Sequence, residues 1–417
     1  SNVRYDGSSR FPGDRRFGLF PSFSGAWKIG REKFLQRASW INNLKIRASW
    51  GQLGNQNIGN YSFQNILSLG QNYVFGGAIG SGATLVNLSN SNISWETTRI
   101  IDYGADVSVL NNTLSLEADY FNKKTSDILY NLPTSAVLGF NAPVQNAGAV
   151  LNTGWEFKLN YRNNIGEFFY SISPNISFVH TEVLDLPGGA DKIITLNASD
   201  YYTVMQKGQS MNSFYGYLSD GLFVDQGDID KSPAQPTSPK PGDIKFRDIS
   251  GPNGVPDGKV DPTYDRTILG SYYPKYTFGG DISLRYKGFD FSMLFQGVAG
   301  VRGVLSRWRA MPFDDGIGNI PAWQTDRWTP DNPNPKAAQP RLLLTFRDVS
   351  SDFWVRNAAY LKLKFLQAGY TIPSRYLNKI GISKLRLYFS ATNLFTVSDY
   401  YKGYDPDQRV SADARYY

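Results

Sequence analysis

The sequence predicts an all-β protein, a portion of an antiparallel transmembrane β-barrel with long outer loops and short periplasmic turns. Three observations support this prediction. Apolar and polar side chains alternate in many short segments, aromatic residues make up 15% of the chain, and stretches rich in Gly, Asn and Pro separate the segments. Alternation puts one set of side chains on each face of a strand. A membrane barrel needs one face against lipid, one against a wet lumen, and aromatic girdles at both interfaces.

The clearest of these segments runs from Trp40 to Tyr61. Its apolar set is Leu44, Ile46, Ala48 and Trp50. Its opposite set is Lys45, Arg47 and Ser49. A strand of a soluble sandwich would show the same alternation, but a charge at every second position favours a wet lumen on the polar side and lipid on the apolar side. The glycines, asparagines and glutamines that follow predict a loop.

The other predicted strands repeat this pattern along the chain. They are Gly18 to Ile29, Arg99 to Leu110, Leu114 to Tyr120, Trp155 to Arg162, Phe168 to Phe178, Asp281 to Lys287, Phe289 to Gln296, Leu361 to Phe365 and Lys384 to Phe389. Short turns, such as the one at Asn111 and Asn112, join neighbouring segments into hairpins. We count about eleven or twelve strands in this way. Pro174 predicts a bulge in its strand, because proline removes a ladder hydrogen bond.

Four long loops separate the hairpins, at residues 51–98, 123–153, 184–277 and 299–353. Short turns on one side and long loops on the other are typical of outer-membrane barrels. The stretch 184–277 is the longest irregular one, and long loops without regular structure are usually functional.

An aspartate-rich segment lies inside that longest loop, at residues 243–265. Carboxylates between glycines are typical of oxygen-ligand Ca²⁺ loops. The candidate ligands are Asp248, Asp257, Asp261 and Asp265. The spacing is not that of an EF-hand, since no final Glu follows at the required position. The alternative interpretation is a solvated acidic loop that holds no cation.

Composition excludes several other classes of protein. The chain has no Cys, so disulfides and Cys-based metal sites are impossible. No apolar run approaches about 18 residues, so no transmembrane helix is expected. The net charge is +7, but Lys and Arg are spread singly along the strands, so we expect no nucleic-acid binding. No signal peptide is seen at the start, so an exported protein would need a longer N-terminus.

Beyond these patterns, four stretches resemble the SusC/RagA-like family of TonB-dependent outer-membrane transporters of Bacteroidetes. The stretches are Arg4 to Phe11 with Gly18 to Trp27, then Ile41 to Tyr61, then Gly242 to Gly297, and finally Phe353 to Pro373 with Ile382 to Phe395 and Tyr401 to Asp407. They span nearly the whole chain. The aspartate-rich segment departs from the family pattern, because Pro252 and Val255-Pro256 interrupt it.

This resemblance implies that residues 1–417 form the C-terminal part of a 22-stranded barrel, without the plug and without the last strand. Half a barrel leaves strand edges that lipid cannot satisfy, so we expect the chain to need the rest of the same barrel.

The resemblance also implies a function and partners. The function is active import of glycans or peptides across the outer membrane. The partners are a SusD-like surface lipoprotein, TonB through the N-terminal part, and outer-membrane lipid. Substrate contacts in such a site would be aromatic faces and hydrogen-bonding groups from loops. The candidates are Tyr201, Tyr202, Trp308, Trp323 and Trp328.

The sequence leaves two alternative functions open. A barrel used only as a scaffold in a larger surface assembly would have the same wall without transport. A β-rich enzyme such as a glycosidase would need two carboxylates at a fixed separation. The available carboxylates are Glu96, Glu117, Asp119 and Glu156, and they sit at alternating strand positions, where lumen polarity explains them. We therefore expect no enzymatic activity and no cofactor apart from the Ca²⁺ considered above.

Overall fold

The computed structural model describes residues 1–35, 37–65, 67–85, 89–131, 143–196, 201–305, 320, 322–342 and 350–408. Its main feature is an 11-stranded antiparallel sheet. The strands, in hydrogen-bonded order, are β1 (Asn2–Gly7), β2 (Phe17–Trp27), β3 (Ile41–Asn55), β8 (Glu96–Val109), β9 (Leu114–Ser126), β12 (Ala149–Ile165), β13 (Phe168–Asp185), β20 (Tyr276–Tyr286), β21 (Phe289–Ala299), β24 (Tyr360–Thr371) and β25 (Arg386–Ser398). The predicted fold class and strand number are confirmed.

Shorter strands and helical turns fill the connections. The small strands are β4 (Leu67–Leu69), β5 (Tyr73–Phe75), β6 (Ala78–Gly80), β7 (Ala83–Leu85), β10 (Leu129–Asn131), β11 (Val144–Asn146), β14 (Lys192–Leu196), β15 (Tyr202–Gln206), β16 (Ser213–Tyr217), β17 (Ser219–Leu222), β18 (Ile244–Phe246), β19 (Arg266–Gly270), β22 (Arg302–Gly303) and β23 (Arg356–Asn357). The helical turns are η1 (Ile29–Arg31), η3 (Pro187–Gly189), α1 (Gln226–Asp230), η5 (Ala322–Thr325), α3 (Ser374–Leu377), η6 (Asn378–Ile380) and η7 (Pro406–Gln408). Among the described residues, no helix has the length and apolar character that crossing a membrane requires.

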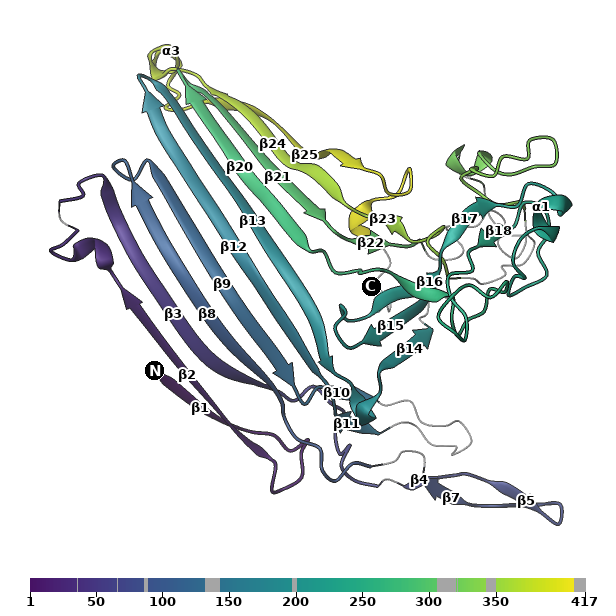
Figure 1. Cartoon of the computed structure of the whole chain (residues 1–417). Helices are drawn as coiled ribbons and strands as arrows, with labels where there is room; N and C mark the ends of the chain where they lie inside the picture. The colour runs from purple at the N-terminus through teal and green to yellow at the C-terminus, as the bar shows by residue number, and fades with distance from the viewer. Residues whose placement is uncertain are drawn as a thin grey trace. The chain divides into compact units, whose positions relative to one another are not determined.

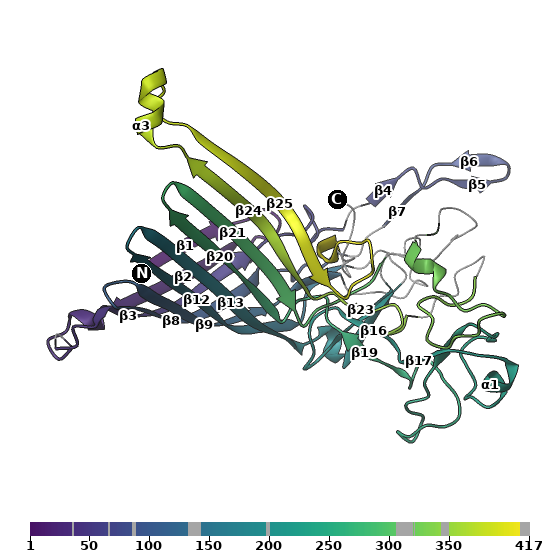
Figure 2. The same ribbon diagram turned by 90° about the horizontal axis from the view of Figure 1, so that it is seen from above.

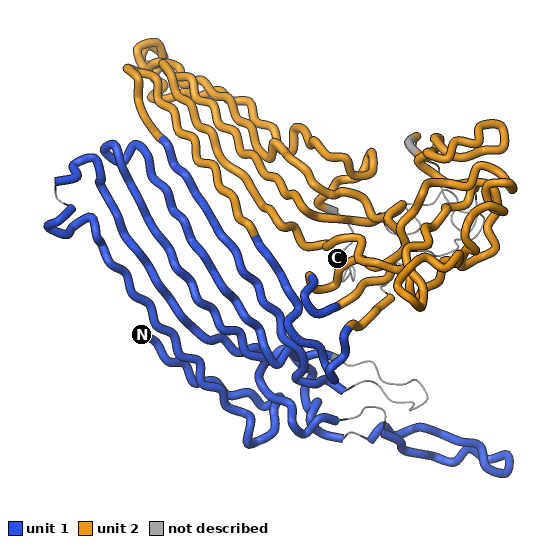
Figure 3. The backbone as a smooth tube through the Cα atoms, viewed as in Figure 1, with its two compact units in different colours: residues 1–161, 179–191, 206–209 blue, residues 162–178, 192–205, 210–417 orange. Residues whose placement is uncertain are grey.

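The chain divides into two compact units, coloured separately in Figure 3. Unit 1 comprises residues 1–161, 179–191 and 206–209, and unit 2 comprises residues 162–178, 192–205 and 210–417.

In unit 1, strands β2, β3, β8 and β9 run side by side (Figure 1). Their register lines up the alternating side chains into rows. One row is Ala48, Tyr103, Tyr120 and Trp155, from β3, β8, β9 and β12. Another, one step along the same face, is Ile46, Ala105, Ala118 and Phe157. The rings of Tyr120 and Trp155 have their centres 5.0 Å apart. This face therefore carries the apolar surface and the aromatic belt that the sequence predicts for contact with lipid.

The hairpin between β8 and β9 turns at Leu110, Asn111 and Asn112. All three residues have positive φ, at 55°, 57° and 60°. Asn tolerates this left-handed conformation better than most residues, which explains why the predicted Asn-Asn turn is found here. The amide of Thr113 closes the turn by donating to the carbonyl of Leu110 at 3.1 Å.

In unit 2, strands β20, β21, β24 and β25 lie next to one another (Figure 2). One apolar row is Ile172, Ile282, Met293, Leu366 and Ala391. The neighbouring polar row is Ser171, Ser283, Ser292, Gln367 and Ser390. Pro174 does not produce the bulge expected from the sequence on the β20 side. It lies opposite Gly280 in an unbroken register, because a glycine partner leaves room for the proline ring.

The predicted loops 184–277 and 299–353 are less irregular than expected. We call the described residues of unit 2 within 192–205, 210–275 and 300–359 the loop layer. It contains a four-stranded sheet in the order β14-β15-β16-β19 and two further strand pairs, β17-β18 and β22-β23. Its main core contains Tyr201, Phe214, Val304 and Trp354. Every residue of β16 is buried, so the alternation that reveals a half-exposed strand is absent there.

Candidate functional site: a charged wall face and a folded loop layer

The polar face of unit 1 carries a cluster of ion pairs across β3, β8 and β9. The Nη2 atom of Arg47 lies 2.8 Å from Oδ1 of Asp106 and 2.9 Å from Oδ1 of Asp119. The Nζ atom of Lys45 lies 3.1 Å from Oδ2 of Asp106. All four side chains are half-buried. The charges that sequence analysis assigned to the lumen are thus paired with each other across strands, which offsets the cost of their partial burial.

Gly104 makes this cluster possible. A Cβ atom at this position would lie 2.2 Å from Oδ1 of Asp119 and 2.6 Å from Cζ of Arg47. Because Gly104 has no side chain, the arginine has room to reach across β8 to β9.

We expect Gly104→Ala to lower the free energy of unfolding by about 1–3 kcal/mol, because the added methyl group must push the ion pair apart. Urea unfolding of the full-length protein in lipid vesicles measures this. Gly25→Ala is the matched control, since a Cβ atom on that β2 residue would meet nothing within 4 Å. Equal losses in the two variants would contradict the role of Gly104.

Unit 2 has a similar cluster on its polar face. Nε of Arg386 donates to Oδ1 of Asp290 at 2.9 Å, and its Nη2 donates to Oε1 of Gln367 at 2.9 Å. Gly369 leaves the space here, since a Cβ atom would lie 2.5 Å from Nη2 of Arg386. The same device, a glycine beside an arginine that bridges strands, therefore occurs in both units.

Lys362 forms a pair that sequence analysis missed. Its side chain is only 2% exposed, and its Nζ lies 2.5 Å from both Oδ1 of Asp405 and Oδ2 of Asp407. Burial alone would raise the pKa of the Asp405 carboxyl, but the hydrogen bond from Lys362 holds that pKa below its usual range. Residues Tyr401 to Asp407 therefore anchor the segment after β25 to β24. They belong to one of the four stretches that resemble the transporter family.

The loop layer carries its own paired charges. Nζ of Lys245 donates to Oδ1 of Asp228 at 2.8 Å. This bond, with the Val224 amide, holds the pKa of the Asp228 carboxyl below its usual range. Burial raises the pKa of the Tyr217 hydroxyl, against the opposing effect of Arg266.

The aromatic substrate-contact candidates have different environments. Tyr201 is 1% exposed in the main core, and Trp328 is 7% exposed in a second core with Leu222 and Ala337. Tyr202 is half-buried, and the guanidinium carbon of Arg266 lies 4.2 Å from its ring centre. Trp308 lies outside the described residues, as does the side chain of Trp323. Their contact with substrate stays a prediction.

The four aspartates proposed for Ca²⁺ are engaged with backbone amides. Asp265 is fully buried and accepts from Ile249, Ser250 and Asp261. The three others also accept from nearby amides, Asp248 from Gly258, Asp257 from Lys259, and Asp261 from Thr263 and Tyr264. Within the described ranges, no group of three or more His, Asp or Glu side chains is placed to hold a metal ion. Calcium binding stays an untested prediction.

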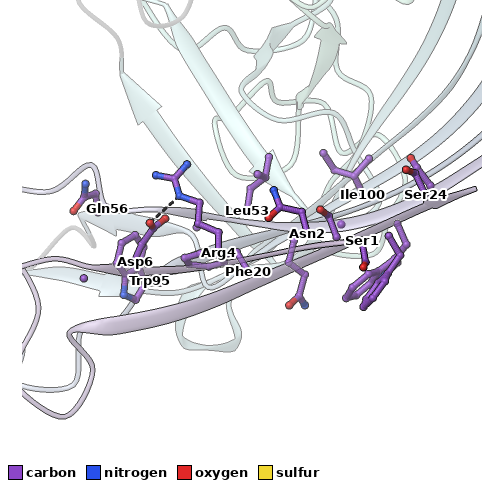
Figure 4. Close-up of a pocket in the computed structure, with 18 residues that line it drawn as sticks. Ser1, Asn2, Arg4, Asp6, Phe20, Ser24, Leu53, Gln56, Trp95 and Ile100 are labelled. Carbon is purple, nitrogen blue, oxygen red and sulfur yellow. Dashed lines mark hydrogen bonds and ion pairs between the residues drawn. The ribbon is translucent and has the colours of Figure 1, made fainter.

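Two larger cavities lie in the separate units. The one in unit 1, of about 910 Å³, is bordered by β1, β2 and β3 and is shown in Figure 4. Phe20 and Trp95 line it, and Nε of Arg4 donates to Oδ1 of Asp6 at 2.7 Å beside them. The one in unit 2, of about 700 Å³, lies in the loop layer and is lined in part by Arg302, Lys336 and Arg356.

Comparison with known proteins identifies the family to which this wall of paired charges belongs. The family described as "TonB dependent receptor-like, beta-barrel" matches residues 2–394. The chain belongs to this family. As a TonB-dependent receptor barrel it is part of an outer-membrane protein, and its two-faced strands fit that location.

Two relatives of this receptor barrel come from different organisms. TonB-dependent receptor P3 of Formosa agariphila is 32% identical over 417 residues, covering 99% of this chain and 40% of the relative. TonB-dependent receptor SusC of Bacteroides thetaiotaomicron is 29% identical over 426 residues, covering 100% of this chain and 40% of the relative. The chain thus spans about two fifths of the length of these relatives.

Solved structures agree with this placement of the receptor barrel. The structure of the RagAB peptide transporter matches with a TM-score of 0.77 and 26% identity, over 97% of this chain and 42% of that one. The "open-open" state of the RagAB peptide importer matches with a TM-score of 0.77 and 27% identity. The resemblance to SusC/RagA-like receptors is therefore confirmed.

Proposed function

We propose that the protein containing this chain imports glycans or peptides across the outer membrane, driven by TonB. The chain supplies part of the barrel wall and several outer loops. The observation that carries the proposal is the two-faced wall, apolar on one side and lined by cross-strand ion pairs on the other, in a member of the TonB-dependent receptor family. Members of this family are receptors and transporters rather than enzymes.

The partners of this proposal follow from the relatives. The solved neighbour RagAB is a peptide transporter, which supports peptides as cargo, and glycans are the class that the resemblance to SusC-like receptors implies. We expect a SusD-like surface lipoprotein over the outer loops, TonB bound through another part of the protein, and the rest of the barrel beside β1 and β25. Each of these two strands has one hydrogen-bonded neighbour in the sheet of the described chain. The aromatic candidates Tyr201, Tyr202, Trp308, Trp323 and Trp328, and Ca²⁺ in residues 243–265, remain part of the proposal.

A gene deletion tests the import function. The strain is deleted for the whole gene and then grown on single oligosaccharides and on defined peptides as the limiting nutrient. We expect loss of growth on at least one of them, and the same loss when TonB is removed. Purification from the outer membrane in detergent is expected to give an intact mass well above 46.7 kDa with a co-purifying lipoprotein. A receptor whose removal changes neither growth nor uptake would be a scaffold, and the proposal would be wrong.

A further inference from the structure

The cavity of the loop layer is bordered by three cationic side chains that reach it from separate segments. Arg302 lies on β22 and Arg356 on β23, two strands that pair with each other. Lys336 comes from the segment after η5. The cavity, of about 700 Å³, is also lined by the ring of Phe353. It is large enough for a small organic ligand.

These cations have no acidic partner in the part of the chain that the structure describes. Within the described residues, neither Arg302, Lys336 nor Arg356 lies within ion-pair distance of a carboxylate, and the side chains of Arg302 and Lys336 make no hydrogen bond. Two aspartates also line the cavity, but both are engaged. Asp220 accepts from Nε of Arg247 at 2.8 Å, and Oδ1 of Asp352 accepts from the amide of Ser219 at 2.8 Å.

Arg356 is the partly buried member of the three cations, whereas Arg302 and Lys336 are exposed. Its guanidinium carbon lies 5.2 Å from the ring centre of Tyr401 and 5.9 Å from that of Phe353. Its Nε atom is buried and has no hydrogen-bond partner. These ring contacts, together with the hydrogen bond between the Arg356 guanidinium and the Tyr401 hydroxyl, restrain the side chain, so less conformational freedom is lost when an anion binds.

Other cations of unit 2 give a contrast. Lys245, Arg341 and Lys362 are partly or fully buried, and each lies within 2.8 Å of an aspartate oxygen. These three cations are paired inside the unit, whereas Arg266 and Arg327, which are also partly buried, have no ion pair with a described residue. At the cavity, no described carboxylate lies within ion-pair distance of the three cations, so their positive charge is available to an anion from outside the protein.

We propose that this cavity binds an oxyanion, a carboxylate or sulfate carried by an organic molecule. Two guanidinium groups offer planar pairs of donors that match such an anion, the Lys336 ammonium adds a third charge, and Phe353 offers an apolar face to the rest of the molecule. As a statement about cargo, this inference rests on the proposed import function and narrows it to acidic peptides or acidic glycans.

Binding to the purified full-length protein in detergent tests the inference. Calorimetry compares two acids with their neutral forms. Acetyl-trialanine is paired with its C-terminal amide, and trigalacturonic acid with its methyl ester. We expect at least one acid to bind roughly tenfold more tightly than its neutral form, the effect of one good charge-assisted contact. The pair that shows the preference identifies the source of the anion.

The variants are Arg302→Gln and Lys336→Gln, whose side chains are exposed and leave the core intact, and Arg356→Gln. Each is expected to reduce the acid preference severalfold, and the double variant of Arg302 and Lys336 to abolish it. Lys231→Gln is the matched control, an exposed lysine of the same unit that does not line the cavity, and it is expected to keep the preference.

Two results would overturn the inference: no acid preference in either pair, or a preference that persists in the double variant. Because binding is measured without uptake, the cavity and the import function fail separately. An acid preference in a protein that transports nothing would leave the site standing and remove the import proposal.

Discussion

Replacing Asp265 by alanine is expected to lower the free energy of local opening of the loop layer by about 3–5 kcal/mol. The reason is that each buried donor left unpaired costs about 1–3 kcal/mol. The carboxylate is 0% exposed. It accepts from the amides of Ile249 at 2.7 Å, Ser250 at 3.1 Å and Asp261 at 2.8 Å. All three amides would lose their acceptor at once. Hydrogen exchange of peptides spanning 249–265 in the full-length protein measures the effect, and we expect exchange to accelerate at least about a hundredfold.

Two control variants separate this role from a general effect of removing a carboxylate. Asp265→Asn keeps one acceptor oxygen, so its free energy of local opening is expected to fall less than that of Asp265→Ala. Asp257→Ala removes an exposed carboxylate that accepts from a single amide, that of Lys259, and is expected to cost under about 1 kcal/mol. Similar exchange rates of residues 249–265 in Asp265→Ala and Asp257→Ala would contradict the structural role of the Asp265 carboxylate.

The second large effect is expected for Trp354→Ala. The cavity left by the side chain is expected to lower the local stability of the loop layer by about 3–5 kcal/mol. Trp354 is 1% exposed in the core that also contains Tyr201 and Phe214. Its carbonyl accepts from the Tyr401 hydroxyl at 2.5 Å, and its ring centre lies 4.9 Å from that of Phe353. Limited proteolysis of the full-length protein in detergent is expected to cleave the loop layer much faster.

Trp40→Ala is the control for this variant, because Trp40 is 61% exposed and outside every described core. It removes the same side chain and is expected to leave the cleavage rate within about twofold. If Trp354→Ala were cleaved no faster than Trp40→Ala, the core described for the loop layer would be wrong.

The strands of the wall were predictable because each has two different faces. Leu44 to Trp50 alternate in sequence, and the structure places Arg47 against Asp106 and Asp119 on the polar side. The turn at Asn111 and Asn112 was predictable because few residues tolerate positive φ. These are local properties, written into neighbouring residues.

The loop layer was not predictable in the same way. In β16, from Ser213 to Tyr217, both faces are buried, so no alternation marks the strand. Its fixing contacts are also remote in sequence, as in the hydroxyl of Ser350 that donates to the carbonyl of Tyr215 at 2.8 Å. A stretch rich in Gly and Pro with short strands therefore resembled an irregular loop.

The candidate site also has features that the sequence predicts and features that depend on the fold. The sequence by itself determined that this protein is a two-faced β wall with polar charges on one side, since strand geometry assigns alternate residues to opposite faces. Only the tertiary structure decided which charges pair and which stay unpaired. Arg302 and Arg356 meet at one cavity through strands of two residues each, and Lys362 meets Asp405 across a distance of 43 residues. Such pairings depend on chain segments brought together by the whole fold, and no local pattern encodes them.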